Sequence, residues 1–365
     1  MFTSLKQGCR SLISSMHSTE LRSQTLYSAN KYTCLLLRCP PIFLFLKILT
    51  IIQFNMKKTI FKNFTAIAMM LAVASVVSCK QNTEKKSEEV TPVAEQAVET
   101  SQEQFGGLAL YTLRDDMGKD VEGTLEEVAK AGYQNIEAAG YKDGKFYGMS
   151  PEDFKKLAES KGLKLISSHQ GSATLENIDT EIADVKAAGF TYFVIPVPPM
   201  GHFKFNNETQ TMGMDPDLDF MVDFLNTVGE KCTEAGLQLL YHNHDFEFKE
   251  NENGVVPIKY FLEKTDTKLV NFQMDLFWVT KAGADPVAYF EEFPGRFKLW
   301  HVKDMDKEGK FAPVGEGTID FGRILAKKEQ SGMEYYMVEQ DMTFNHTPIE
   351  AINISHKGLE EIGFE

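Results

Sequence analysis

The stretch SPEDFKKLAESKGLKLISSH, Ser150 to His169, contains the pattern of one helix followed by one strand. Ser150 is a preferred N-cap residue, and Pro151 can begin the helix because the first turn needs no N–H there. Gly162 is the residue type that commonly follows the last helical turn. The short run Lys164–His169 then has the apolar composition of a strand. The stretch therefore predicts a helix over residues 151–160 and a strand that ends on a histidine.

The same alternation continues from Gly106 to the C-terminus, over about 260 residues. Strands are predicted at Gly107–Leu113, Gln134–Ala138, Lys164–His169, Tyr192–Val197, Gln238–His242, Val270–Asp275, Lys298–Val302 and Tyr335–Glu339. Helices are predicted at Thr124–Ala131, Pro151–Ser160, Leu175–Ala188, Pro216–Ala235, Pro257–Lys264, Pro286–Phe293, Phe321–Ser331 and Pro348–Glu361. Eight such units predict a single α/β domain, a (β/α)8 TIM barrel over 106–365. The alternative is a doubly wound open sheet, which usually has fewer strands and a glycine-rich phosphate turn.

The residues before the barrel fall into three parts. From Met56, lysines at positions 57, 58 and 62 precede the apolar run Phe64–Val77, and Val-Val-Ser-Cys79 resembles a bacterial lipobox. We expect a lipoprotein signal peptide at 56–78, with a plain signal peptide or a short anchor helix as the alternative. Because a signal should begin a protein, residues 1–55 are interpreted as an extension upstream of the true start. Residues 79–105, rich in Glu, Gln, Lys, Ser and Thr, are predicted to form a flexible linker.

Charge and cysteine content limit the expected partners. Residues 1–78 hold nine of the 38 Lys and Arg but one of the 52 Asp and Glu, which leaves a net charge of about −22 for the rest. Such a surface repels phosphate backbones, so nucleic acid is not an expected partner. Only Cys79 and Cys232 remain, so no disulfide framework is expected. We predict an exported, lipid-anchored lipoprotein that faces the periplasm and contacts the membrane only through Cys79.

Polar residues stand at the ends of most predicted strands, where a barrel places its reactive groups. They are Glu137, His169, His242, His244, Asp275, His301, Lys303 and Glu339. Because side chains alternate along a strand, His242 shares a face with His244, and His301 with Lys303. The set His242, Asp275, His301 and Glu339, from strands five to eight, could surround one divalent ion. Two imidazoles and two carboxylates suit Mn²⁺, Co²⁺, Zn²⁺ or Ni²⁺ better than Mg²⁺ or Ca²⁺.

The motifs at these strand ends resemble those of the xylose isomerase-like sugar isomerase/epimerase superfamily, of the AP endonuclease 2 type. They are Leu-Tyr-His242-Asn-His244, Gln-Met-Asp275, Trp-His301-Val-Lys303-Asp304, Val-Gly-Glu-Gly317 and Met-Val-Glu339-Gln-Asp341. The family includes ketose 3-epimerases, inosose dehydratase and endonuclease IV. The resemblance implies a barrel from about Gly106 onward, and one metal ion held by Glu, Asp, His and Glu at the ends of strands five to eight.

The resemblance also implies an activity. It is isomerisation or epimerisation of a small carbohydrate, by proton abstraction next to a carbonyl through a metal-stabilised enediolate. The expected cofactor is one divalent ion, Mn²⁺, Co²⁺ or Zn²⁺. His242, however, stands where sugar epimerases carry a proton-exchanging glutamate. The His-x-His variant looks more like the inosose dehydratase branch and the lyases and hydratases of 3-keto-sugars, so elimination is the alternative. A sugar-binding lipoprotein without turnover is a further alternative.

Three residues are candidate catalytic groups. Lys303 could transfer protons, because it follows His301 on the same face and a nearby cation would lower its pKa. The alternative for Lys303 is an ion pair with Asp304 or Asp306. His169 and Glu137 could contact a substrate hydroxyl or act as bases, or they could simply be hydrogen-bonded at a strand end.

Three further residues are candidate substrate-binding groups. His244 lies roughly 6–7 Å along the strand from His242. It could face the substrate, support a ligand or be the ligand itself, and Glu247 is a weaker ligand alternative. Trp278, beside Phe277, could stack on a sugar face. His202 belongs to an apolar loop, residues 196–203, that either covers the site or packs on the next helix.

Overall fold

The computed structural model describes residues 106–209 and 211–364, and these contain a closed barrel of eight strands. Around the barrel the strands follow the order β1 (Gly106–Ala109), β14 (Tyr335–Val338), β11 (Phe297–Val302), β10 (Val270–Asp275), β9 (Gln238–His242), β6 (Tyr192–Ile195), β5 (Lys164–His169) and β2 (Asn135–Ala138). Every neighbouring pair is parallel. The predicted TIM barrel is therefore confirmed, and the open sheet is wrong.

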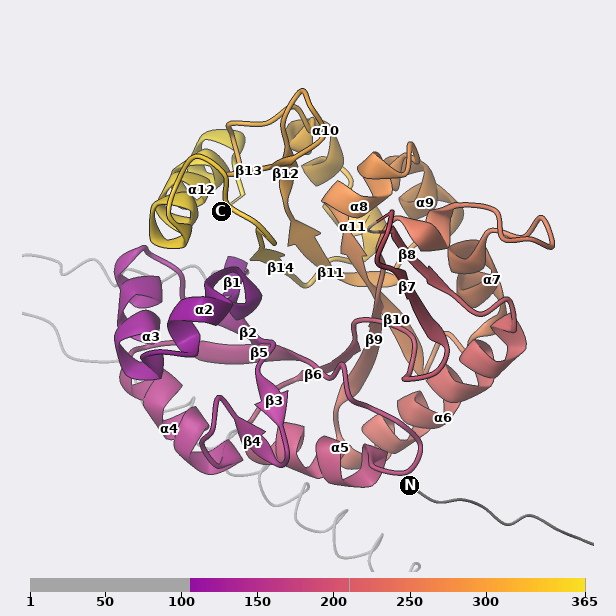
Figure 1. Cartoon of the computed structure of the whole chain (residues 1–365), viewed down its shortest axis with the longest axis horizontal. Helices are drawn as coiled ribbons and strands as arrows, with labels where there is room; N and C mark the ends of the chain where they lie inside the picture. Colours follow the sequence, from indigo (N-terminus) through magenta and orange to yellow (C-terminus); the bar gives the residue numbers. More distant parts are fainter. Residues whose placement is uncertain (1–105, 210, 365) are drawn as a thin grey trace, which may run out of the picture. The chain divides into compact units, whose positions relative to one another are not determined.

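The helices lie outside the ring of strands (Figure 1). They are α3 (Val121–Lys130), α4 (Pro151–Ser160), α5 (Ile178–Ala187), α6 (Leu218–Ala235), α7 (Pro257–Lys264), α9 (Pro286–Glu292), α10 (Phe321–Leu325), α11 (Lys328–Ser331) and α12 (Pro348–Ile362). A further helix, α8 (Leu276–Lys281), directly follows β10. In α4 the Ser150 side chain accepts the backbone N–H of Asp153, so the predicted cap is present. The larger apolar core lies between these helices and the strands, and a smaller one fills the inside of the barrel.

Two predicted elements differ from the structure in type or continuity, and the bounds of the others agree to within three residues. The strand expected at Gly107–Leu113 ends at Ala109, and the chain continues as the 3-10 helix η1 (Leu110–Leu113) and the short helix α2 (Arg114–Met117). The neighbours explain this end, because β14 and β2 pair with β1 only as far as Leu108 and Ala109. The helix expected at 321–331 is divided into α10 and α11.

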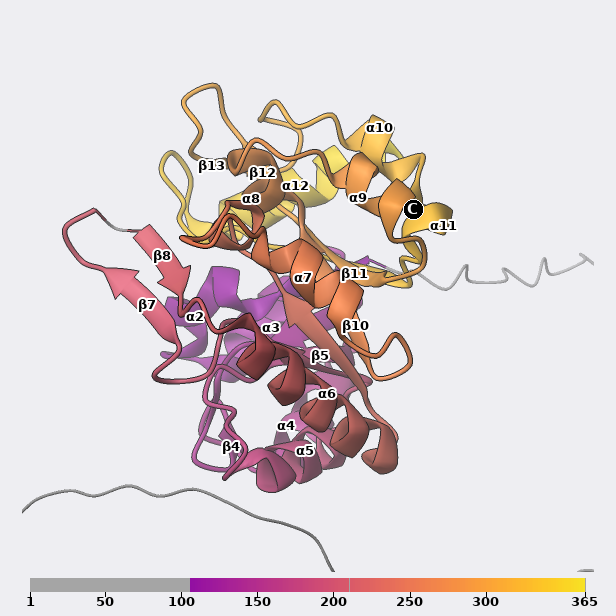
Figure 2. The same cartoon turned by 90° about the vertical axis from the view of Figure 1, so that its right-hand side faces the viewer.

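Three two-stranded hairpins that were not predicted follow barrel strands. They are β3–β4 (Tyr141–Lys142, Lys145–Phe146), β7–β8 (Phe203–Asn206, Thr211–Met214) and β12–β13 (Asp304–Met305, Phe311–Ala312). They come after β2, β6 and β11, at the face where a TIM barrel carries its active site. The loop at 196–203 leads into β7, and the β7–β8 hairpin projects from the barrel (Figure 2).

The predicted extension at 1–55, the signal peptide at 56–78, the lipid on Cys79 and the linker at 79–105 lie outside the described residues and stay predictions. Within the described ranges, none of the helices combines the length and apolar character that a membrane crossing requires.

Candidate active site and metal centre

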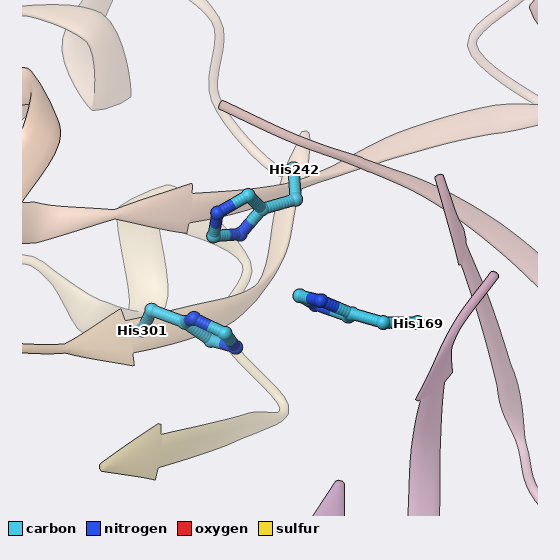
Figure 3. Close-up of side chains that lie close together, drawn as sticks. All are labelled: His169, His242 and His301. Atoms are coloured by element: carbon cyan, nitrogen blue, oxygen red, sulfur yellow. The ribbon is translucent and has the colours of Figure 1, made fainter. Parts of the chain in front are cut away.

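A polar layer follows directly on the apolar layer inside the barrel. Leu240 and Leu299 face the interior, and His242 and His301 follow two residues later on the same strands. Because side chains two residues apart share a face, both histidines also point inward. Figure 3 shows the rings of His169, His242 and His301 directed toward one another from β5, β9 and β11. The barrel thus collects residues that are far apart in the sequence.

The cluster is almost completely buried. The side chains of Glu137, Asp275 and His301 have no exposed surface. Those of His242, Lys303 and Glu339 are 2–4% exposed. His169 is 11% exposed, which makes it the most accessible of the seven. A buried charge requires a partner, so the contacts among these groups determine their protonation.

His301 lies between two carboxylates. Its Nδ1 is 2.8 Å from Glu339 Oε2, and its Nε2 donates to Glu137 Oε1 at 2.7 Å. Burial alone would lower the pKa of His301, but Glu137 and Glu339 raise it to about 10. Burial would raise the pKa of Glu137, but His169 and His301 lower it to about 2. In this arrangement Glu137 is ionised and holds the His301 ring.

Gln273 fixes the orientation of His242. Its amide Nε2 donates to Glu137 Oε2 at 2.6 Å, so its Oε1 faces the histidines. That oxygen lies 2.9 Å from His242 Nδ1 and 2.8 Å from His169 Nε2. An amide oxygen only accepts, so both of these ring nitrogens carry the hydrogen. His242 Nε2 is left without a proton, 3.9 Å from Asp275 Oδ2.

Gln273 was not among the predicted site residues. It precedes Asp275 by two positions on β10, within the Gln-Met-Asp motif, so the alternation of faces was the signal that could have found it. Burial, followed by the charge of His301, lowers the pKa of His242 well below its ordinary value. His242 is therefore a neutral imidazole, which is the form that binds metals.

Three of the four predicted ligands present closely spaced atoms that fit a divalent ion, and Nε2 of the fourth, His242, lies 3.9 Å from Asp275 Oδ2. Asp275, His301 and Glu339 form one group of closely spaced ligand atoms, and His169, His242 and His301 form a second. His301 Nδ1 is 3.8 Å from Asp275 Oδ2, close to the roughly 3–3.5 Å that separates ligands of one transition-metal ion. The second group adds His169 to the candidate ligands.

Two further observations support this fit. Metal-binding histidines usually hydrogen-bond a second residue through the ring nitrogen that faces away from the ion. Here Gln273 is that partner for His242, and Glu137 is that partner for His301. In addition, no described residue meets the geometry of a hydrogen-bond donor to the buried Oδ2 of Asp275, which is instead paired with a cation, the Lys303 ammonium at 2.9 Å. The choice of ligands stays a prediction.

Lys303 contacts the two carboxylates of this predicted ligand set. Its Nζ lies 2.9 Å from Asp275 Oδ2, 2.5 Å from Glu339 Oε2 and 2.7 Å from Asp341 Oδ1. Burial lowers its pKa, but Asp275, Asp341 and Glu339 raise it well above the ordinary value. The protein's own groups therefore raise the pKa of Lys303 and do not lower it as expected, and Lys303 is a fixed positive charge.

The alternative ion pair of Lys303 with Asp304 or Asp306 is also wrong. Asp304 instead accepts backbone N–H groups of Gly315 and Gly317, and Asp306 accepts that of Lys310. Both carboxylates organise the loops around the β12–β13 hairpin.

His244 and Trp278 lie beside the cluster, with ring centroids 5.6 Å apart. His244 Nδ1 and Trp278 Nε1 are buried, and neither has a hydrogen-bond partner among the described residues. Burial lowers the pKa of His244 to about 3, so the ring is neutral. Unpaired buried polar atoms next to a reactive cluster are suited to hydroxyl groups of a ligand.

Glu247 and His202 have other surroundings. Glu247 accepts Tyr241 Oη–H and the backbone N–H of His244, both at 2.8 Å, and burial raises its pKa to about 8. It therefore holds the strand end and is not directed at the cluster. The His202 ring stacks on Phe220 of α6 at 3.7 Å, so the structure places it against the helix.

Known proteins share this barrel. The model of the xylose isomerase-like TIM barrel family matches residues 125–351, more than half of the chain. An inosose dehydratase of Lacticaseibacillus casei is 25% identical over 261 residues, which are 62% of this chain and 85% of that protein. A crystal structure of a sugar phosphate isomerase/epimerase from Parabacteroides distasonis is 28% identical, with a TM-score of 0.61, over 75% of this chain and 99% of that one. The chain belongs to the xylose isomerase-like TIM barrel family.

Proposed function

We propose that the chain is a divalent-metal-dependent lyase or dehydratase, which removes the proton next to the carbonyl of a sugar or sugar-like polyol and expels a β-substituent. The observation that carries this proposal is the neutral His242, which Gln273 holds where an epimerase is expected to carry a proton-exchanging carboxylate. One of the two matched bases of an epimerase is therefore replaced. The similarity to an inosose dehydratase supports the same reaction class.

The bound ion would supply Lewis acidity at the substrate carbonyl and the oxygen beside it. Asp275, Glu339, His301 and His242 would hold it. The protein's own part begins with His169, whose Nε2 hydrogen is directed at Gln273 and whose Nδ1 would accept the C–H proton. The C–H electron pair then forms a C=C bond and the C–O bond to the β-substituent breaks. The departing oxygen takes the proton from Nδ1 of His169, so it leaves as the alcohol or water and His169 returns to its starting form.

Other groups hold the reactants. The ammonium of Lys303 provides positive charge beside the reacting atoms, and such a fixed charge stabilises an oxygen that becomes negative. His244 and Trp278 supply buried polar atoms for sugar hydroxyls. Glu137 is a positioning residue, because its oxygens accept from His301, Gln273 and Ser167.

The test measures proton exchange and elimination separately. The purified protein is loaded with Zn²⁺, Mn²⁺ or Co²⁺ and incubated with 3-keto-glucosides and inososes in D2O, and products are followed by NMR. We expect wild type to eliminate the β-substituent. The His169→Asn variant should bind the same amount of metal but should not eliminate the β-substituent. His301→Ala should lose both metal and activity, whereas the helix α12 variant His356→Asn should retain both. Turnover by metal-free wild type would refute the proposal.

Isomerisation or epimerisation is the second candidate. The 28% identical sugar phosphate isomerase/epimerase favours it, because it matches over 99% of its own length. In the same NMR experiment this reaction would exchange a C–H for deuterium without loss of a substituent.

We also propose that the protein is exported and lipid-anchored, which rests on the sequence of residues 56–79. Labelled palmitate should be incorporated into wild type and not into Cys79→Ser. A labelled Cys79→Ser variant, or wild type found entirely in the cytoplasmic fraction, would contradict this.

A further inference from the structure

A separate cavity of about 340 Å³ is formed by the segments that follow β1 and β2. Its walls come from η1, α2, the start of α3 and the segment that follows β2. Tyr111, Arg114, Met117, Gly140 and Tyr147 are among the lining residues. None of the candidate metal, catalytic or substrate-binding residues belongs to the lining. The volume lies within the range of sites for small molecules.

One wall of this cavity is connected to the cluster through Asp341. Arg114 Nη2 donates to the backbone oxygen of Asp341 at 2.8 Å, and the Asp341 carboxylate accepts from Lys303. Burial, together with the carboxylates of Asp341 and Glu339, raises the pKa of Tyr111. The Tyr111 ring is therefore within electrostatic reach of the cluster, although 40% of its surface is exposed.

The opposite wall is connected to the cluster through β2. Tyr147 Oη accepts the backbone N–H of Ala139 at 3.0 Å, two residues beyond Glu137. Its ring lies directly on the backbone of Gly140, where an added Cβ would be 2.2 Å from the ring. Tyr147 has a φ of 51°, which is unfavourable for a bulky residue. Such strain persists where the surroundings impose it, often at ligand sites.

Two tyrosines and an arginine of the cavity wall define its chemistry. The Arg114 guanidinium lies 4.5 Å from the centroid of the Tyr111 ring and donates to the backbone oxygen of Tyr111. These contacts hold the ring in place, while much of its surface stays accessible. A fixed, partly exposed aromatic ring binds other rings by stacking, and an arginine with spare N–H groups binds their oxygens.

We infer that this cavity binds a second ring attached to the reacting sugar, so that the substrate is a glycoside and not a free monosaccharide. The inference rests on the proposed function, because it takes the reacting sugar to lie at the His301 cluster. The second ring would stack on Tyr111 and meet Arg114. Either a second sugar or an aromatic aglycone has this chemistry, and in elimination that ring would leave as the alcohol.

The test compares one-ring and two-ring probes by isothermal titration of the zinc-loaded full chain. The glucose series consists of glucose, methyl glucoside, phenyl glucoside and cellobiose. The galactose series consists of galactose, methyl galactoside, phenyl galactoside and lactose. We expect at least one two-ring probe to bind more tightly than the methyl glycoside. Tyr111→Ala should raise the Kd of that probe roughly three- to tenfold and leave the Kd of the methyl glycoside unchanged. Tighter binding of the phenyl glycoside than of the methyl glycoside identifies an aromatic aglycone. Tighter binding of the disaccharide identifies a second sugar.

Two control variants separate stacking from misfolding. Tyr111→Phe keeps the ring and should bind like wild type. Tyr260→Ala removes a partly buried tyrosine of α7 that does not line the cavity, and it should change no Kd. Equal Kd values for one-ring and two-ring probes would overturn the inference, and so would a Tyr111→Ala variant that weakens both equally. In these cases the proposed function stands. If no probe binds the loaded protein, the inference fails, whereas the proposed function is decided separately by the elimination assay with 3-keto-glucosides and inososes.

Discussion

Replacement of Lys303 by methionine should strongly destabilise the metal-free protein. Methionine keeps the length and apolar stem of the side chain but removes the ammonium that contacts Asp275, Glu339 and Asp341. The Lys303 side chain is 2% exposed, so water cannot replace the lost charge. Loss of one partner from a buried ion pair costs roughly 3–5 kcal/mol. For a domain of this size that corresponds to a fall of roughly 6–20 °C in the unfolding temperature.

The assay is thermal and urea unfolding of the chelated protein, with and without added Zn²⁺. A divalent ion would neutralise the same carboxylates of Asp275 and Glu339, so Zn²⁺ should stabilise Lys303→Met more than wild type. Lys327→Met is the matched control, because Lys327 forms an exposed ion pair with Glu291 at 2.9 Å. Exposed pairs contribute little, so this variant should unfold like wild type.

Two results would refute the reasoning. If Lys303→Met without metal is as stable as wild type, the ammonium does not hold the three carboxylates together. If Zn²⁺ stabilises the variant and wild type equally, the ion and the ammonium do not share Asp275 and Glu339.

Three other changes have defined outcomes. Gln273→Ala should weaken metal binding by roughly 10–100-fold in a competition titration, because two histidines lose the partner that orients them. Burial raises the pKa of Glu247 to about 8, so wild type should lose stability as pH rises from about 4.5 through 8. Glu247→Gln carries no ionisable group and should not show that loss in urea unfolding. Gly358→Ala should lower the unfolding temperature, because its Cβ would lie 2.0 Å from Val314 O, whereas Gly322→Ala, with only an ordinary contact at 3.7 Å, should not.

The sequence predicted the barrel and the strand ends because both depend on local patterns. The apolar run before His242 and the one before His301 each end on a polar residue, and parallel strands bring their carboxyl ends to one face. That reasoning needs no knowledge of which strands are neighbours. It therefore identified Glu137, which lies 2.7 Å from His301 although 164 residues separate the two.

The partners of each group could not be predicted in the same way, because they depend on the register between strands. Gln273 pairs with His242 across β10 and β9, and this register brings its amide to His169 and Glu137 as well. The pKa of Lys303 depends on three carboxylates from two other segments, and the sequence alone does not give their distances. The length of β1 was likewise determined by its neighbours and not by its own composition.

The charges of the cluster explain why Lys303 and a metal ion must be considered together. Lys303 and His301 are positive, and Glu137 and Glu339 are negative. Asp275, whose pKa burial raises to about 6, adds a charge that changes near neutral pH. A divalent ion at Asp275, His301 Nδ1 and Glu339 would add two positive charges to this balance. The buried cluster can accept them only if His301 releases its Nδ1 proton and the ammonium of Lys303 moves toward Asp341, which it already contacts. Metal binding, protonation of His301 and the position of Lys303 are therefore one linked equilibrium.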